Sequence, residues 1–337
     1  MSRTQRPEVV AITGAAAGVG RAAAVAFARR GARIGLIARG GPGMDGLEGA
    51  KQDVEAAGGQ AVILPADVAD ATQVEAAAVK LEEAFGPIDV WVNVAMASVF
   101  SPFKEMTADE FKRTTEVTYL GQVYGTMAAL RRMIPRNQGS IVLVGSALAY
   151  RSIPLQSAYC GAKSGIRGFI DSVRCELIHD GSNIRICMVQ MPALNTPQFS
   201  WVKSRLSNNP QPVPPIFLPE VAAEAIYFAA HHKRRELYVG FSTIKACVAN
   251  MLAPGLLDVY LARTGYQAQQ TGQPANPNRP HNLWEALPGD HGAEGTFGSR
   301  SRSRSPALWL VEHQEQVALA GAAGIAVACM LVARKLR

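Results

Sequence analysis

Short apolar runs alternate with longer segments of helical character over roughly the first 240 residues of the chain. The run at 140–144 is almost continuously apolar, as expected for a parallel strand covered on both faces. Strands are predicted at 8–12, 33–38, 61–64, 88–93, 140–144, 184–189 and 237–239. Helices are predicted at 71–85, 108–133 and 220–231. Two further helices are expected, one that ends near residue 30 and another that carries Tyr159. Regular alternation of this kind predicts an α/β fold built on a doubly wound parallel sheet.

The alternation of strands and helices is interrupted between residues 191 and 219, where seven prolines exclude a long helix. A segment of this length after a sheet strand is typical of a lid over a site. Four of its apolar residues could wall an apolar pocket, or they could simply hold the segment on the protein: Phe199, Trp201, Ile216 and Phe217.

These patterns predict a single core domain at 1–251, in which residues 191–219 form the lid. Residues 252–306 include a stretch rich in Gln, Asn and Pro at 267–280 and a stretch in which Ser and Arg alternate at 299–305. This composition indicates an extension or linker that is partly disordered. Residues 307–337 are predicted to contain an apolar C-terminal helix. Within it, 317–333 carries no charge and is followed by a basic end, so it could attach to a membrane, or it could pack on the protein or at a subunit interface.

Composition narrows the classes of function. The formal net charge is +7 over 337 residues, but the basic residues are scattered and aromatic residues do not interleave with them, which argues against nucleic-acid binding. The five cysteines show no metal-ligand spacing, and the histidines near the C-terminus are dispersed, so no metal site is predicted. The N-terminus has no signal-peptide core, and we therefore expect a cytoplasmic catalytic domain.

A glycine-rich turn follows the first predicted strand. It reads Thr13-Gly-Ala-Ala-Ala-Gly-Val-Gly20 and leads into the alanine-rich helix. Glycines allow a close approach of the backbone, and the helix N-terminus supplies N–H donors and positive potential for a phosphate group. Strand, turn and helix in this order predict a dinucleotide-binding site of the Rossmann type.

The end of the second predicted strand bears on the choice of cofactor. An acidic residue there would bind the adenosine ribose hydroxyls of NAD, but the chain has Ala38-Arg39-Gly40 instead. Arg39 could meet a 2′-phosphate, which favours NADP(H) over NAD(H). The alternative is a solvated surface arginine with no special role.

Tyr159 and Lys163 are four residues apart on a predicted helix and therefore share one face. A free phenol with a pKa of about 10 is a poor acid or base at neutral pH. A nearby ammonium favours the phenolate and lowers that pKa, so the pair could pass a proton to or from an alcohol or carbonyl.

Together with Asp67-Val68 and Ser146, these motifs make residues 7–250 resemble the short-chain dehydrogenase/reductase family. The resemblance implies that Tyr159 is the general acid/base, that Lys163 lowers its pKa and holds the nicotinamide ribose, and that Ser146 binds the substrate oxygen. The cofactor residues that it implies are Gly14, Ala17, Gly18, Val19, Gly20, Arg39, Asp67, Val68, Asn93, Tyr159, Lys163, Pro192 and Thr196. It also implies a homodimer or homotetramer, paired through the long helix and the Tyr-bearing helix.

Two positions depart from the family pattern. The Asn-Asn-Ala-Gly strand motif reads Asn93-Val94-Ala95-Met96 here, which makes the strand end bulkier. The asparagine that usually anchors a proton-relay water in the long helix is replaced by Thr118. A threonine hydroxyl could bond a water, so the expected consequence is a rerouted relay and an altered rate.

The leading hypothesis is an NADP(H)-dependent oxidoreductase that interconverts an alcohol and a carbonyl compound. The apolar residues of the lid and the apolar run at 317–333 suggest a lipophilic substrate as one option. The alternative is a catalytically impaired nucleotide-binding regulator or membrane scaffold on the same fold, suggested by Thr118, Met96 and the long extension.

Overall fold

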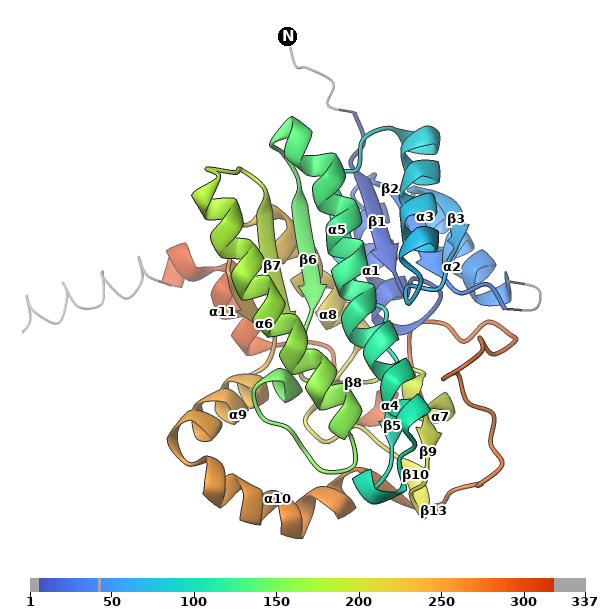
Figure 1. The fold of residues 1–337 in the computed structure, drawn as a ribbon, viewed down its shortest axis with the longest axis vertical. Helices are drawn as coiled ribbons and strands as arrows, with labels where there is room; N and C mark the ends of the chain where they lie inside the picture. The colour runs from blue at the N-terminus through green and yellow to red at the C-terminus, as the bar shows by residue number, and fades with distance from the viewer. Residues whose placement is uncertain (1–5, 42–43, 318–337) are drawn as a thin grey trace, which may run out of the picture.

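The computed structural model describes residues 6–41 and 44–317 of the chain. Its centre is a seven-stranded parallel sheet with strand order β12-β7-β6-β4-β1-β2-β3 (Figure 1). The strands of this sheet are β1 (Val9–Thr13), β2 (Arg33–Ala38), β3 (Gln60–Pro65), β4 (Val90–Asn93), β6 (Ser140–Val144), β7 (Arg185–Gln190) and β12 (Glu236–Tyr238). The predicted doubly wound fold is confirmed.

Helices cover both faces of the sheet. One face packs against α1 (Gly18–Ala28), α2 (Asp45–Ala56) and α8 (Pro219–His231), and the other packs against α3 (Ala71–Phe85), α5 (Gly121–Met133) and α6 (Ser157–His179). Side chains along β1 alternate between the two cores, with Val10 and Ile12 on the first face and Val9 and Ala11 on the second. The strands are buried on both faces, which is why they read as apolar runs in the sequence.

The helix expected at 108–133 is divided. It consists of α4 (Ala108–Thr115), a π-helical turn (Glu116–Leu120) and α5. A capping box between Thr107 and Glu110 fixes its start. The π-helical turn lies in its centre and contains Thr118.

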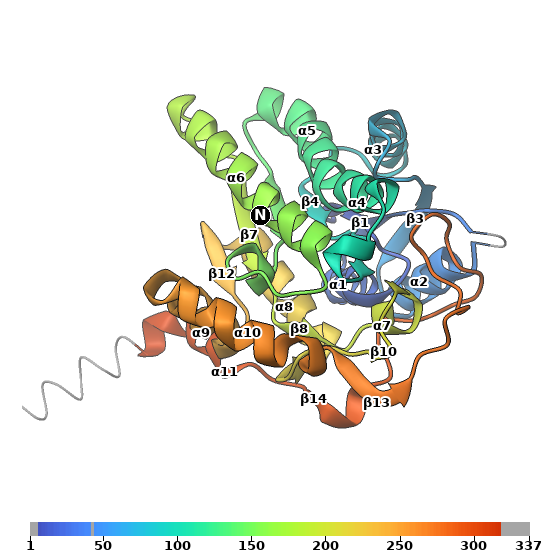
Figure 2. The same ribbon diagram turned by 60° about the horizontal axis from the view of Figure 1, so that its bottom comes forward.

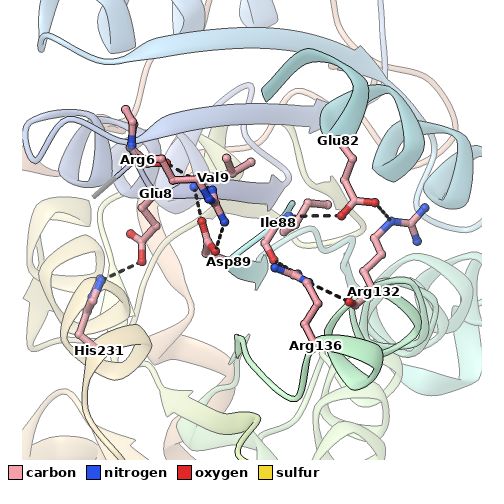
Figure 3. Close-up of polar contacts among 10 residues, drawn as sticks. Arg6, Glu8, Val9, Glu82, Ile88, Asp89, Arg132, Arg136 and His231 are labelled. Atoms are coloured by element: carbon pink, nitrogen blue, oxygen red, sulfur yellow. Dashed lines mark hydrogen bonds and ion pairs between the residues drawn. The ribbon is translucent and has the colours of Figure 1, made fainter. Parts of the chain in front are cut away.

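Polar contacts hold the amino ends of the sheet strands together (Figure 3). The Asp89 carboxylate, just before β4, accepts the Val9 N–H at 2.9 Å and pairs with the Arg6 guanidinium at 2.7 Å. The Glu8 carboxylate contacts the His231 imidazole of α8 at 3.1 Å. These contacts join elements at the end of the sheet opposite to the glycine-rich turn, so we assign them to the stability of the fold.

The segment 191–219 contains short elements at the carboxyl end of the sheet. They are β8 (Ala193–Leu194), α7 (Gln198–Trp201), β9 (Lys203–Ser204), β10 (Asn208–Pro210) and β11 (Ile216–Phe217). Strand β9 pairs with β5 (Val99–Phe100), and β8 pairs with β11. The β9–β5 pairing ties the segment to the chain that follows β4, and the β8–β11 pairing joins the two ends of the segment to each other.

Residues beyond β12 form more regular structure than the sequence pattern predicted, and of these elements only the helix at Pro306–Glu312 overlaps a predicted helix, the one at 307–337. They contain α9 (Phe241–Leu252), α10 (Pro254–Ala268), β13 (Gln270–Pro274), β14 (Ser301–Arg302) and α11 (Pro306–Glu312). Strand β13 pairs antiparallel with β10, and β14 pairs with β11. Figures 1 and 2 show α9 and α10 at one end of the molecule, beyond the carboxyl end of the sheet. The extension therefore packs on the lid segment.

In the part of the chain that the structure describes, no helix has both the length and the apolar character that crossing a bilayer requires. The apolar stretch predicted at 317–333 lies outside the described residues except for Val317.

Candidate functional site

The glycine-rich turn joins β1 to α1 at the carboxyl end of the sheet. Gly14 and Gly18 have φ values of +69° and +57°, which disfavour residues with a side chain. A Cβ added to Gly20 would lie 2.2 Å from the carbonyl oxygen of Gly14, so only glycine allows this close packing of helix on turn. The first turn of α1 carries no capping side chain and no acidic residue, as suits the binding of an anion.

Arg39 lies where β2 ends, and its guanidinium contacts the C-terminal extension. Nη1 donates to the carbonyl oxygen of Trp284 at 2.8 Å, and Nη2 donates to that of Asn282 at 2.5 Å. Burial and the neighbouring Arg113 lower the pKa of Arg39, while Asp67 opposes that shift. The sequence did not predict these contacts, because they join residues more than 240 positions apart.

Asp67 follows β3 and faces the same region. Its carboxylate accepts the Ala69 N–H at 3.0 Å and forms a short ion pair with Arg113 of α4. Arg113 also donates from Nε to the carbonyl oxygen of Leu283 at 3.2 Å. Arg113 is thus a further residue of this end of the site, and nothing in the sequence pattern distinguishes it from other helix-surface arginines.

Tyr159 and Ser146 meet above the carboxyl ends of the central strands. Burial raises the pKa of Tyr159 above its ordinary value, and a hydrogen bond with the Ser146 side chain opposes that shift. Ser146 follows β6, where its N–H donates to Oε1 of the buried Gln190 at 3.0 Å and its Oγ accepts the Leu148 N–H at 3.1 Å. The serine is therefore held from two sides, with its hydroxyl near the phenol.

Lys163 lies one turn beyond Tyr159 on α6 and is 1% exposed. Its Nζ lies 5.6 Å from the centre of the Tyr159 ring and donates to the carbonyl oxygen of Val144 at 2.6 Å. Burial lowers the pKa of Lys163 to about 7. The expected lowering of the Tyr159 pKa by an ammonium is therefore opposed by the burial of both side chains.

Thr118 is fully buried, and its hydroxyl bonds to the backbone. Oγ1 donates to the carbonyl oxygen of Ala97 at 2.8 Å and accepts the Ala97 N–H at 2.9 Å. The hydroxyl has one proton, and this bond uses it. The side chain thus joins the π-helical turn to the segment after β4, and its donor is engaged there.

Most predicted cofactor residues line one continuous cavity of about 550 Å³. It is lined by Gly14, Ala17, Gly18, Val19, Gly20, Arg39, Asp67, Val68, Ser146, Tyr159, Lys163, Pro192 and Thr196. Asn93 does not line it. The Asn93 amide accepts from the Trp91 indole at 3.0 Å and donates to the Thr126 hydroxyl at 3.2 Å, which joins β4 to α5.

The cavity continues from Tyr159 to a predominantly apolar end. Met96, Ile153, Phe199 and Val213 contribute to its wall, together with Tyr260, Leu261 and Thr264 of α10. The spacing of Tyr260 and Thr264 places both on one face of α10. This spacing was visible in the sequence, but nothing indicated that the helix would line the same cavity as Tyr159.

Among residues 6–41 and 44–317, no group of three or more His, Cys, Asp or Glu side chains is arranged to hold a metal ion. The described cavity brings together a phenol, a hydroxyl and an amine beside the glycine-rich turn.

Comparison with known proteins agrees with this arrangement. A family model described as short chain dehydrogenase matches residues 8–205. The uncharacterised oxidoreductase YxnA of Bacillus subtilis is 31% identical over 89% of this chain and 84% of its own length. A 3-dehydrosphinganine reductase of Danio rerio is 34% identical over 57% of this chain and 58% of its own length.

Among solved structures, a 3-ketoacyl-ACP reductase from Sinorhizobium meliloti is similar to this chain. The TM-score is 0.58 at 26% sequence identity, and the match covers 68% of this chain and 96% of that protein. The central sheet and its helices are thus shared with that reductase.

Proposed function

This chain belongs to the short-chain dehydrogenase/reductase family of oxidoreductases, and on that premise we propose that it transfers a hydride between NADP(H) and an alcohol or carbonyl substrate. The observation that carries the proposal is the single cavity that joins the glycine-rich turn to Ser146, Tyr159 and Lys163. A screen of aldehydes and ketones that follows NADPH absorbance tests it. Turnover of at least one carbonyl compound is expected, and failure across a broad panel contradicts the proposal.

The residues at the turn fit a dinucleotide. The glycines leave space that a Cβ would fill, and the first turn of α1 presents backbone N–H groups without a competing acidic side chain. A bound nicotinamide dinucleotide would supply or accept the hydride. In this proposal the backbone around Gly18 and Gly20 holds the phosphates, and Pro192 and Thr196 lie beside the nicotinamide.

The protein's own contribution is orientation and a proton. Ser146 donates its hydroxyl to the substrate oxygen and fixes it near the phenol of Tyr159. Tyr159 donates its proton to that oxygen in reduction and accepts it in oxidation. A protonated phenol is the form that reduction requires; burial raises the pKa of Tyr159 and makes it a weaker donor, and the hydrogen bond with Ser146 partly offsets this. Lys163 lies one helical turn from Tyr159, and we propose that it influences the proton transfer from that position. The hydrogen bond that its Nζ donates to the carbonyl oxygen of Val144 holds it there.

Arg39 is the residue that we propose reads the 2′-phosphate of NADP(H). It lies at the end of β2 and lines the cavity with Asp67 and Gly41. A guanidinium binds a phosphate through two parallel charge-assisted bonds, whereas NAD(H) offers no such group at that position.

Replacing Arg39 by alanine is therefore expected to raise the Kd of NADPH by about 10- to 100-fold, because one charged hydrogen-bonded pair contributes about 1.5–3 kcal/mol. Titration of the same variant with NADH is the matched control: NADH has no 2′-phosphate, so its Kd should not rise. An NADPH affinity that is not weakened would show that Arg39 does not bind the 2′-phosphate.

The alternative function, a regulator or scaffold with impaired catalysis, is favoured by the engagement of the Thr118 hydroxyl with Ala97. Against it stands the intact Ser146, Tyr159 and Lys163 set around one cavity. Dinucleotide binding without turnover of any carbonyl compound would support this alternative.

We further propose that the substrate is lipophilic and that α9 and α10 contact a lipid surface. Met251, Leu252 and Leu256 are 74–80% exposed around the junction of these helices, and α10 also lines the apolar end of the cavity. The exposed charge at this end includes Lys245, which suits anionic lipid headgroups. The apolar run at 317–333 is a second stretch for which we propose membrane contact, and it lies outside the described residues except for Val317.

Sedimentation with vesicles of phosphatidylcholine and phosphatidylglycerol tests this contact. The Leu252→Glu, Leu256→Glu double variant should bind vesicles at least about tenfold more weakly, because two charges replace apolar side chains at the interface. Val79→Glu, at an exposed position of α3, is the control and should bind as the unchanged protein does. Failure of the unchanged protein to sediment with vesicles contradicts the proposal.

The homodimer or homotetramer implied by the family resemblance is part of this proposal as well. Met127 on α5 and Ile178 on α6 are exposed apolar residues on the two helices expected to pair.

A further inference from the structure

A segment of the C-terminal extension crosses the proposed cofactor cleft. Residues 282–292, here called the strap, follow β13 and run past α7 toward α2, as the orange trace in Figures 1 and 2 shows. Asn282, Ala286, Leu287, Gly289 and His291 of the strap line the same cavity as the glycine-rich turn. The strap is therefore a wall of this cavity, contributed by residues outside the part that the family model matches.

One end of the strap bonds to the phosphate-binding turn. The N–H of Gly18, the first residue of α1, donates to the carbonyl oxygen of Gly292 at 3.0 Å. The Asp290 carboxylate forms a two-pronged ion pair with Arg21, whose side chain is 6% exposed. The N–H of Gly289 donates to the Asp45 carboxylate of α2 at 2.9 Å. A carbonyl oxygen thus occupies a helix N-terminal donor that suits a phosphate oxygen.

The other end of the strap bonds to the residues at the ends of β2 and β3. The Arg39 guanidinium donates to the carbonyl oxygens of Asn282 and Trp284. Leu283 between them is 1% exposed, and its carbonyl oxygen accepts from Arg113. Both terminal nitrogens of Arg39 therefore each donate to a backbone oxygen of the strap.

The strap is also joined to the lid segment. The N–H of Asn282 donates to the carbonyl oxygen of Trp201 at 3.1 Å, and the His291 ring stands edge-on to the Trp201 ring with centroids 4.6 Å apart. Just beyond the strap, the Gly295 N–H donates to the carbonyl oxygen of Asn195 at 3.2 Å. A movement of the strap would therefore be transmitted to the segment that encloses the substrate end of the cavity.

We propose that the strap competes with the phosphate groups of the dinucleotide, so that the cofactor binds only when the strap is displaced from Gly18 and Arg39. The inference rests on the proposed function, because it concerns the same cleft. A protein in which only a fraction of molecules has a free site binds its ligand more weakly by that fraction. Loosening the strap should therefore strengthen cofactor binding.

Asp290→Ala tests the competition. The variant removes the ion pair to Arg21, which keeps its contact to the Asp53 carboxylate at 2.7 Å and so is not left without a partner. The Kd of NADPH, measured by fluorescence titration, should fall about tenfold, and the association rate should rise by a similar factor. Asp171→Ala, which breaks surface pairs with Arg174 and Arg235 on a different part of the fold, should leave both unchanged.

Backbone amide exchange provides a second readout. Exchange in 282–292 should be faster in Asp290→Ala than in the unchanged protein, and NADPH should accelerate it in the unchanged protein. The competition would be overturned by an NADPH affinity that is unchanged or weaker in Asp290→Ala, or by slower exchange in 282–292 on adding NADPH. Either result would show that the strap is a wall that holds the bound cofactor. If neither NADPH nor NADH binds any variant, the proposed function fails and this inference fails with it.

Discussion

Replacing Tyr159 by phenylalanine is expected to lower kcat for carbonyl reduction by about 10³-fold, within the range that loss of a positioned proton donor produces. The ring remains to pack in the cavity wall, but the phenolic proton that neutralises the substrate oxygen is gone. Because the substitution leaves the glycine-rich turn unchanged, the Kd of NADPH should change little. Steady-state kinetics and a cofactor titration on the same preparation measure both.

Tyr124→Phe is the matched control for this variant. Tyr124 lies on α5 beside the core of the second sheet face and does not line the cavity, so its loss of a hydroxyl should leave kcat near the unchanged value. Activity retained in Tyr159→Phe would refute the assignment of the proton donor, whichever substrate is used.

Replacing Gly20 by alanine is expected to weaken NADPH binding at least about tenfold and to lower the free energy of unfolding by about 1–3 kcal/mol. The added Cβ would lie 2.2 Å from the backbone oxygen of Gly14, and a backbone atom cannot move aside as a flexible side chain can. The turn would have to open, which shifts the N–H groups that face the phosphates. Urea denaturation and dinucleotide titration measure the two effects.

Gly168→Ala on α6 separates this close approach from the general effect of a methyl group. A Cβ at Gly168 meets no other atom within 4 Å, so alanine should stabilise the helix by about 0.5–1 kcal/mol. Equal stability and equal NADPH affinity in Gly20→Ala and the unchanged protein would contradict the proposed role of the turn.

Part of the candidate site could be predicted because its signals are local. Gly14, Gly18 and Gly20 lie within seven residues, and the strand and helix around them follow from the apolar pattern. Tyr159 and Lys163 share a helix face by their spacing, and the structure places both at the cavity with Ser146. Such motifs carry their geometry with them, since a strand end or a helix turn positions each residue.

Asn93 shows the limit of carrying a motif over. The position matches the family strand, yet its amide bonds to Trp91 and Thr126 inside the core. Thr118 is a similar case, because its partner Ala97 lies 21 residues away and the spacing gave no sign of the contact. In both cases the role of a polar side chain depends on which group lies opposite it after folding.

Residues 252–306 mark the largest difference between pattern and structure. Their polar composition and prolines indicated a linker, but α10 covers the apolar end of the cavity and the strap crosses the cofactor cleft. The strap is held mainly by hydrogen bonds to its backbone carbonyls and by one ion pair. It needs few buried apolar side chains, so its sequence shows little apolar periodicity. Backbone bonds leave no signature in the side-chain pattern, so this segment was not predicted.

The order of apolar runs, the glycine-rich turn and the helical spacing of Tyr159 and Lys163 specify the sheet, the turn before α1 and the shared face of these two residues, because each arises from neighbours along the chain. Folding alone decides that Arg39 faces the carbonyls of Asn282 and Trp284 and that Asp290 pairs with Arg21. Those partners are more than 240 residues apart, and only the packing of the extension on the lid brings them together. Access to the cofactor cleft is therefore a property of the tertiary structure.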